Sequence, residues 1–185
     1  MPEEKAREHL PRLNANAYRG RSVIHWTLTM DQRATGWLSE KFHEEFRWAL
    51  LHGCSRYEVA CPLYCLMPDH AHLLVVGWTA QADQRRFISF LRQKTEPLLV
   101  ATKAIWQKQP YDHVLRPQES DRYAFEALAH YIAENPVRAG LVSDKVHWPF
   151  RGCMIPGYPE LTPSLSDYWL RYWRLMAYQN GRMPP

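Results

Sequence analysis

Two histidines, His70 and His72, are separated by one residue at the start of an apolar run, His70 to Trp78 (HAHLLVVGW). In a strand, residues i and i+2 point to the same face, so the two imidazoles would lie side by side. Two neighbouring imidazoles are suitable ligands for one divalent cation. The same pattern also fits two surface histidines on a half-exposed strand, and the pair alone does not decide between these interpretations.

Tyr131 is the second candidate for chemistry, because it precedes Asn135 by four residues in a segment with helical periodicity. Positions i and i+4 share a helical face, so a phenol and an amide oxygen would be presented together. A tyrosine hydroxyl has an ordinary pKa of about 10 and needs a metal or a base to become a nucleophile. Taken alone, Tyr131 is more simply a packing tyrosine with its hydroxyl at the surface.

The elements that position these residues follow from hydrophobic periodicity. We expect strands over residues 22–30, 57–67 and 70–78, with a tight turn at Pro68-Asp69 that makes the last two antiparallel neighbours. We expect helices over residues 39–52 (N-capped by Ser39), 82–104 (kinked at Pro97), 119–134 and 164–178, and an irregular segment or short strand over 105–116. This order indicates an α+β domain with an antiparallel sheet and helices on one face.

The chain has 185 residues, of which 46% are hydrophobic, and a formal net charge of +4 at pH 7. This size predicts one compact domain, and the mildly basic charge permits an anionic partner without requiring one. No apolar run approaches the roughly 20 residues that span a bilayer, and the charged N-terminus lacks the features of a signal peptide. We therefore expect no membrane association, a cytoplasmic location and four free cysteine thiols.

Several strings resemble one known family, the single-tyrosine HUH transposases, and within it the branch called REP-associated tyrosine transposases. The string Leu66 to Val75 (LMPDHAHLLV) resembles the family's His-hydrophobic-His strand, and His130 to Val142 (HYIAENPVRAGLV) resembles its nucleophile helix. Between them, Trp106-Gln107 and Tyr111 to Arg116 (YDHVLR) are also similar. The branch often has a glycine pair before its first strand, which Tyr18 to Ser22 (YRGRS) lacks.

The resemblance implies a ferredoxin-like α+β domain whose central antiparallel sheet carries the His-x-His motif. It assigns His70 and His72 to metal binding, Tyr131 to the nucleophile and Asn135 to the third metal-ligand position, with Mg²⁺ or Mn²⁺ as the cofactor. It covers about residues 18–150, after a loose leader (1–17) and before a C-terminal extension with a helix (151–185). The activity implied is cleavage and rejoining of single-stranded DNA through a 5′-phosphotyrosine intermediate, at hairpins of the REP type.

The partner implied is single-stranded or hairpin DNA, bound by a monomer or a homodimer. Cationic side chains along the chain are candidates for phosphate contacts: Arg19, Arg21, Arg85, Arg86, Arg92, Lys94, Arg116 and Arg138. Trp106 and His113 are candidates for stacking on unpaired bases or bonding to them, although core packing is an equal alternative for Trp106. Two rival functions remain, a non-catalytic hairpin-binding protein derived from a transposase and a metal-dependent hydrolase in which water attacks.

Overall fold

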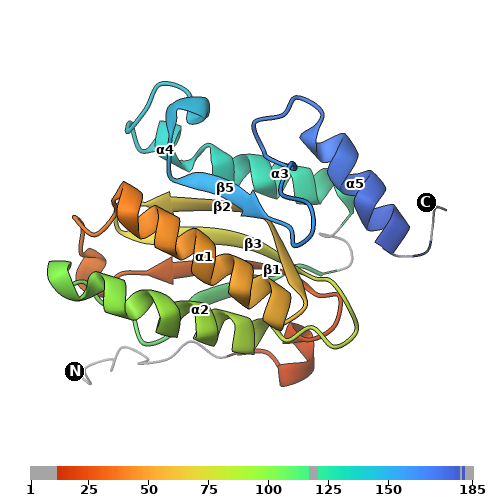
Figure 1. The fold of residues 1–185 in the computed structure, drawn as a ribbon, viewed down its shortest axis with the longest axis horizontal. Coiled ribbons are helices and arrows are strands. Elements are labelled where there is room, and N and C mark those ends of the chain that lie inside the picture. Colours follow the sequence, from red (N-terminus) through yellow and green to blue (C-terminus); the bar gives the residue numbers. More distant parts are fainter. Residues whose placement is uncertain (1–11, 117–120, 180, 182–185) are drawn as a thin grey trace, which may run out of the picture.

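The protein is described by a computed structural model covering residues 12–116, 121–179 and 181, and its centre is a five-stranded sheet (Figure 1). All paired strands are antiparallel, in the order β4-β1-β3-β2-β5. The strands are β1 (Val23–Thr29), β2 (Val59–Met67), β3 (His70–Gly77), β4 (Tyr111–Val114) and β5 (Arg151–Met154). The fold class expected from the sequence, a ferredoxin-like α+β domain with a central antiparallel sheet, is confirmed.

Helices cover both faces of the sheet, whereas the sequence predicted helices on one face only. The α-helices are α1 (Glu40–Arg56), α2 (Gln84–Leu99), α3 (Arg122–Ala133), α4 (Asn135–Arg138) and α5 (Tyr168–Gln179). Short 3-10 helices lie at Ala15–Tyr18, Asp31–Arg33, Val100–Thr102 and Lys145–His147. Helices α1 and α2 pack on one face, and α3 and α5 contribute their apolar stripes to a second core on the other.

The local signals in the sequence explain where the helices begin. The Ser39 hydroxyl accepts a hydrogen bond from the Phe42 backbone N–H, as the predicted N-cap should. Asp83 caps α2 and Asp121 caps α3 in the same way. Pro97 does not break α2, because it lies in the last turn and removes a single backbone hydrogen bond there. The start predicted for α3, at Glu119, lies outside the described residues, as does most of the predicted leader.

The strand β5 was not expected, because it follows Trp148-Pro149 in a proline-rich stretch. It pairs with β2 at the edge of the sheet, where Gly152 approaches the Tyr64 ring closely. A Cβ atom at Gly152 would lie 2.7 Å from the Tyr64 hydroxyl oxygen. The segment after residue 150 thus supplies both an edge strand and α5, the helix expected there.

Strand β3 separates its residues between the two faces with a period of two. Ala71, Leu73 and Val75 join the core beneath α1 and α2. Leu74 and Val76 join the core beneath α3 and α5, so His70 and His72 belong to that second face. At the end of β3, a Cβ atom on Gly77 would lie 1.6 Å from the Gly20 carbonyl oxygen, so only glycine fits there.

Two further expectations can be compared with the described residues. All four cysteines are buried free thiols, as predicted. Within residues 12–116, 121–179 and 181, no helix is long and apolar enough to cross a membrane.

Candidate active site

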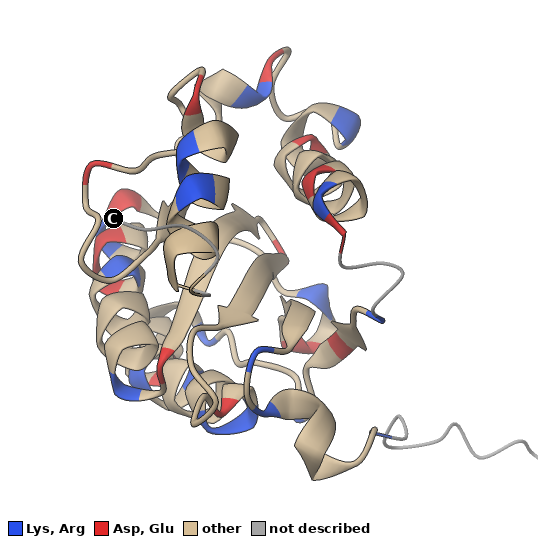
Figure 2. Cartoon of the chain, turned by 90° about the vertical axis from the view of Figure 1, so that its right-hand side faces the viewer, with Lys and Arg blue, Asp and Glu red and all other residues tan. Residues whose placement is uncertain are grey.

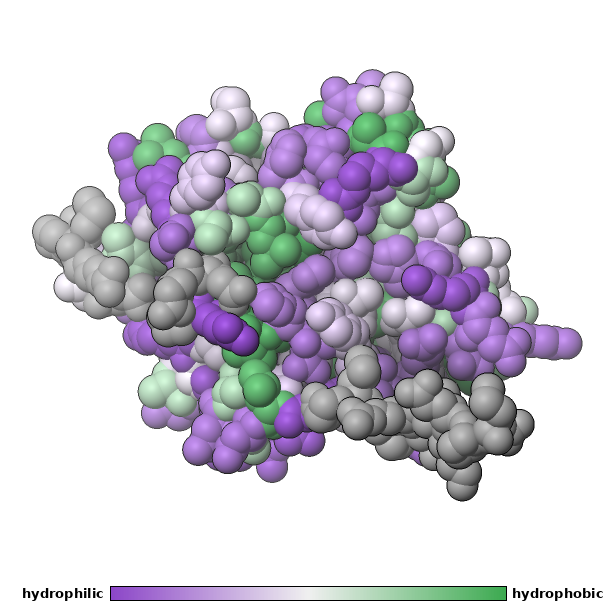
Figure 3. Space-filling view, turned by 180° about the vertical axis from the view of Figure 1, so that it is seen from behind, coloured by the Kyte–Doolittle hydropathy of each residue, from purple (hydrophilic) through white to green (hydrophobic). Residues whose placement is uncertain are grey.

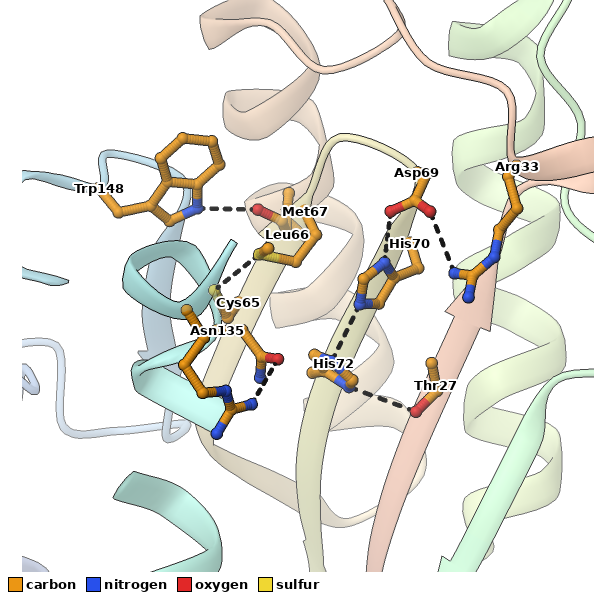
Figure 4. A network of polar contacts seen from close by, with 11 residues as sticks. Thr27, Arg33, Cys65, Leu66, Met67, Asp69, His70, His72, Asn135 and Trp148 are labelled. Carbon is orange, nitrogen blue, oxygen red and sulfur yellow. Dashed lines mark hydrogen bonds and ion pairs between the residues drawn. The ribbon is translucent and has the colours of Figure 1, made fainter. Parts of the chain in front are cut away.

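The imidazoles of His70 and His72 converge at the start of β3 (Figure 4). Their Nε2 atoms are 3.0 Å apart, and the two rings are nearly perpendicular. Two ligand atoms about 2.1 Å from one cation and at right angles to each other are about 3.0 Å apart. The spacing of the two nitrogens therefore fits two adjacent positions in the coordination sphere of one small divalent ion.

The other ring nitrogen of each histidine has a protein partner. His70 Nδ1 lies 2.5 Å from an Asp69 carboxylate oxygen, and the second oxygen of Asp69 pairs with Arg33 at 3.1 Å. On the other histidine, Nδ1 lies 3.0 Å from His25 Nε2 and 3.3 Å from Thr27 Oγ1. Outer partners of this kind hold the proton on Nδ1 and leave the Nε2 lone pair for a metal.

His25 and Thr27 reach the site because of strand register, since β1 pairs with β3 so that Thr27 lies opposite His72. Sequence analysis did not identify His25, Thr27, Asp69 or Arg33. Only Asp69, next to His70 in the chain, carried a local signal.

Burial keeps the two inner histidines neutral. Desolvation lowers the pKa of His72 to about 3, with smaller contributions from His25, His70, Arg138 and Arg33. Desolvation also lowers the pKa of His25 to about 4, helped by His113 and His70. Neutral imidazole is the form that binds metals, so the site is ready for a cation at neutral pH. His72 is only 8% exposed, so the alternative of two surface histidines does not hold for this residue.

Asn135 presents an oxygen at this site. Its side-chain N–H groups donate to the backbone carbonyls of Tyr131 and Ile132, at 3.2 and 3.1 Å. Carbonyls only accept, so the amide nitrogen faces the helix and Oδ1 faces outward. Figure 4 draws this amide on the side of the helix that faces His72. A neutral oxygen beside two imidazoles suits a hard ion such as Mg²⁺ or Mn²⁺.

Tyr131 lies one helical turn before Asn135 and is 50% exposed. The Arg138 guanidinium covers its ring, with Cζ 3.8 Å from the ring centroid. Arg138 also donates to Asn135 Oδ1 at 2.8 Å, and its charge contributes to lowering the pKa of His72. One guanidinium thus contacts the predicted nucleophile and the predicted third ligand, and its charge acts on His72.

In the described part of the chain, no group of three or more His, Cys, Asp or Glu residues could hold a metal ion. A site that combines two histidines with an amide oxygen and the oxygens of a DNA phosphate does not need such a group. The donor set of His70, His72 and Asn135 therefore fits a metal that completes its coordination with substrate oxygens.

Two of the predicted DNA contacts have structural roles instead. Trp106 is 4% exposed, and its indole N–H donates to Thr95 Oγ1 at 3.0 Å, so it packs in the core and cannot stack on a base. Arg92 is partly buried, and its guanidinium donates to the backbone carbonyls of Gln107 and Lys108. It ties α2 to the segment before β4, which a scan of charges along the sequence cannot detect.

The remaining predicted contacts are exposed but do not form one patch. Figure 2 shows Lys and Arg residues on both sides of the sheet. Arg19, Arg85 and Arg86 line adjoining hollows beside α2, on the side opposite the histidine pair. Lys94 lies over the Phe90 ring on α2. His113 is opposite His25 in the β1–β4 pairing, near the site, and Arg21 and Arg116 are exposed near strand ends.

The visible surface of the face on the far side from α1 and α2 carries mostly hydrophilic residues (Figure 3). Helices α3 and α4 contact β2 on this face. The fold and the site together define a class, the α+β domains in which a His-x-His strand is accompanied by a helix bearing a tyrosine.

Comparison with known proteins agrees with this class. No family model matches the chain. A curated protein from Haemophilus influenzae, named "Putative REP-associated tyrosine transposase", is 25% identical over 155 residues, covering 75% of this chain and 85% of that protein. A solved structure of a REP-associated tyrosine transposase bound to a REP hairpin matches with a TM-score of 0.62 and 19% identity, covering 77% of this chain and 81% of that one.

The second match shows the shared fold, and the first adds a likeness in sequence. The resemblance to REP-associated tyrosine transposases that the motifs indicated is therefore confirmed. Over about three quarters of its length, the chain is thus similar to proteins of this kind.

Proposed function

We propose that this protein is a metal-dependent single-stranded DNA endonuclease and strand transferase with Tyr131 as its nucleophile. The observation that carries the proposal is the convergence of His70 Nε2 and His72 Nε2 at 3.0 Å, with the Asn135 oxygen presented from the helix that bears Tyr131. His70, His72 and Asn135 would hold Mg²⁺ or Mn²⁺, which when bound draws charge from the scissile phosphate.

The reaction balances without an external energy source. The Tyr131 oxygen attacks phosphorus and forms a new phosphodiester, while the bond from phosphorus to the 3′ oxygen of the neighbouring nucleotide breaks. The tyrosine proton leaves to solvent or to the departing 3′ oxygen. A 3′-hydroxyl of another strand can then attack the phosphotyrosine and release Tyr131, which joins the strands.

The substrate we propose is a hairpin with a single-stranded flank. The solved relative with the same fold is bound to a REP hairpin. The proposed phosphate contacts are the exposed cations Arg19, Arg21, Arg85, Arg86, Lys94, Arg116 and Arg138. His113 is the proposed base contact, because it is exposed beside the site. A hairpin-binding protein without catalysis is the second candidate, because the solved relative with the same fold is seen in complex with a hairpin.

A covalent adduct test separates these functions. Labelled hairpin DNA with a single-stranded flank is incubated with Mn²⁺ and the wild type, Tyr131→Phe or Tyr123→Phe, and run on a denaturing gel. Tyr123 is a matched control, because it lies on α3 two turns earlier and is 86% exposed. We expect a shifted protein–DNA band with the wild type and Tyr123→Phe, and none with Tyr131→Phe.

Each other outcome has a definite meaning. An adduct that persists in Tyr131→Phe identifies another nucleophile and overturns the proposal. Cleavage without an adduct in the wild type indicates attack by water, and binding without cleavage indicates the hairpin-binding protein.

A further inference from the structure

Arg138 holds the oxygen that the proposed function assigns to the metal. It lies at the end of α4, three residues after Asn135, and its Nη2 donates to Asn135 Oδ1 at 2.8 Å. The other polar atom of that amide, Nδ2, is already engaged with the Tyr131 and Ile132 carbonyls. The amide therefore cannot turn to offer a different atom, and Oδ1 has Arg138 as its partner.

A guanidinium and a divalent cation are poor neighbours on one amide oxygen. Both are positively charged, and on one oxygen they would be close enough to repel each other even where solvent screens them in part. The charge of Arg138 already reaches His72, where it helps to lower the pKa. Binding of a cation to the three ligands is therefore favoured when Arg138 leaves Asn135.

The same guanidinium has a second anchor that metal binding does not disturb. It lies over the Tyr131 ring, with Cζ 3.8 Å from the centroid, in a cation–π contact. A phosphate attacked by the Tyr131 hydroxyl must come to this ring, and guanidinium donors bind phosphate oxygens in pairs. Once released from Asn135, Arg138 lies beside the place where a phosphate has to be.

We propose that Arg138 is a catalytic residue with two alternative partners, the Asn135 oxygen when the metal is absent and the scissile phosphate when the metal is bound. This inference rests on the proposed function, both for the metal at Asn135 and for the scissile phosphate. Arg138 then competes with the metal for Asn135 in the free protein, and it stabilises the transferring phosphate in the complex. Removing it has opposite effects on metal affinity and on cleavage, which a merely structural residue does not produce.

The test measures both properties in the full chain. Titration calorimetry with Mn²⁺ and no DNA compares the wild type with Arg138→Ala, Arg138→Lys and the control Arg171→Ala. Arg171 is an exposed arginine on α5 that pairs with Asp167, so its loss changes net charge equally. We expect Arg138→Ala to bind Mn²⁺ about 3- to 10-fold more tightly, the range for one hydrogen bond that no longer has to be broken. Arg171→Ala should match the wild type.

Cleavage at saturating Mn²⁺ supplies the second readout. Arg138→Ala should cut the flanked hairpin about 100- to 1,000-fold more slowly, as expected when a donor to the developing charge is lost. Arg138→Lys keeps the charge without the paired donors, so it should recover part of the rate. Thermal unfolding of each variant in a chelator confirms that the exposed substitution leaves the fold intact.

Several results would overturn the inference. Unchanged or weaker Mn²⁺ binding by Arg138→Ala would show that Arg138 does not compete with the metal for Asn135, whichever residue is the nucleophile. Tighter Mn²⁺ binding by Arg138→Ala together with cleavage at the wild-type rate would show that Arg138 does not act on the scissile phosphate. Failure of the proposed function appears separately, as an adduct that survives in Tyr131→Phe, and leaves the calorimetric result to decide the competition.

Discussion

His70 and His72 are assigned the same role, but their surroundings predict unequal costs of removal. His72 is 8% exposed, and its Nδ1 contacts His25 and Thr27. His70 is more exposed, and Asp69 is its partner at Nδ1. The two variants His72→Ala and His70→Ala should therefore differ in stability while sharing one functional defect.

The expected magnitudes follow from what each variant leaves behind. His72→Ala empties a buried position and leaves His25 Nε2 without its imidazole partner, which costs about 1–3 kcal/mol for the unsatisfied group. Loss of the buried ring raises the total to about 2–4 kcal/mol. His70→Ala leaves Asp69 paired with Arg33 and should cost about 1 kcal/mol or less.

Urea unfolding in a chelator measures this difference, and Mn²⁺ calorimetry measures the shared defect. Both variants should lose Mn²⁺ binding, whereas His52→Ala, at an exposed position on α1, should change neither property. Equal destabilisation by the two variants would refute the reasoning from burial. Wild-type affinity for Mn²⁺ in either would refute the assignment of the metal site.

Three further predictions test other features. In a chelator, the free energy of unfolding should be nearly constant above about pH 7.5, where His25 and His72 are neutral in both the folded and the unfolded chain. The free energy of unfolding should fall as the pH drops toward 4, because only the unfolded chain takes up protons on these two histidines. The expected loss is up to about 1.4 kcal/mol per pH unit for each histidine. Urea midpoints that are the same at pH 7, 6 and 5 would contradict this. Hairpin affinity should fall steeply with salt. If Arg85 and Arg86 both contact phosphates, the double variant Arg85→Gln, Arg86→Gln should reduce the slope of log K against log salt by about 2. An unchanged slope would show that neither residue lies in the DNA interface. Gly77→Ala should prevent the close approach of Gly20 to β3 and lower the thermal midpoint by several degrees, which a melting curve equal to that of the wild type would disprove.

Local sequence patterns were sufficient to predict that His70 lies beside His72 and that Tyr131 lies beside Asn135. The two-residue spacing of His70 and His72 determines that they share a face of a strand, whatever the strand packs against. The four-residue spacing of Tyr131 and Asn135 determines that the amide can bond back to the carbonyl one turn earlier, as it does. These relations depend only on backbone periodicity, so a single sequence contains them. Assignment of Asn135 to the metal still came from the family resemblance.

The surroundings of those pairs were decided by tertiary structure. His25 is 47 positions from His72, and only the register of β1 against β3 brings it to His72 Nδ1. The edge strand β5 forms because β2 offers unpaired backbone groups there, not because its own residues favour a strand. Trp106 is exposed or buried according to what packs on it, and the Trp37 and Thr95 side chains that cover it come from other segments. Hydrogen-bond register and side-chain packing join residues that are distant in the chain, so a local pattern does not contain them.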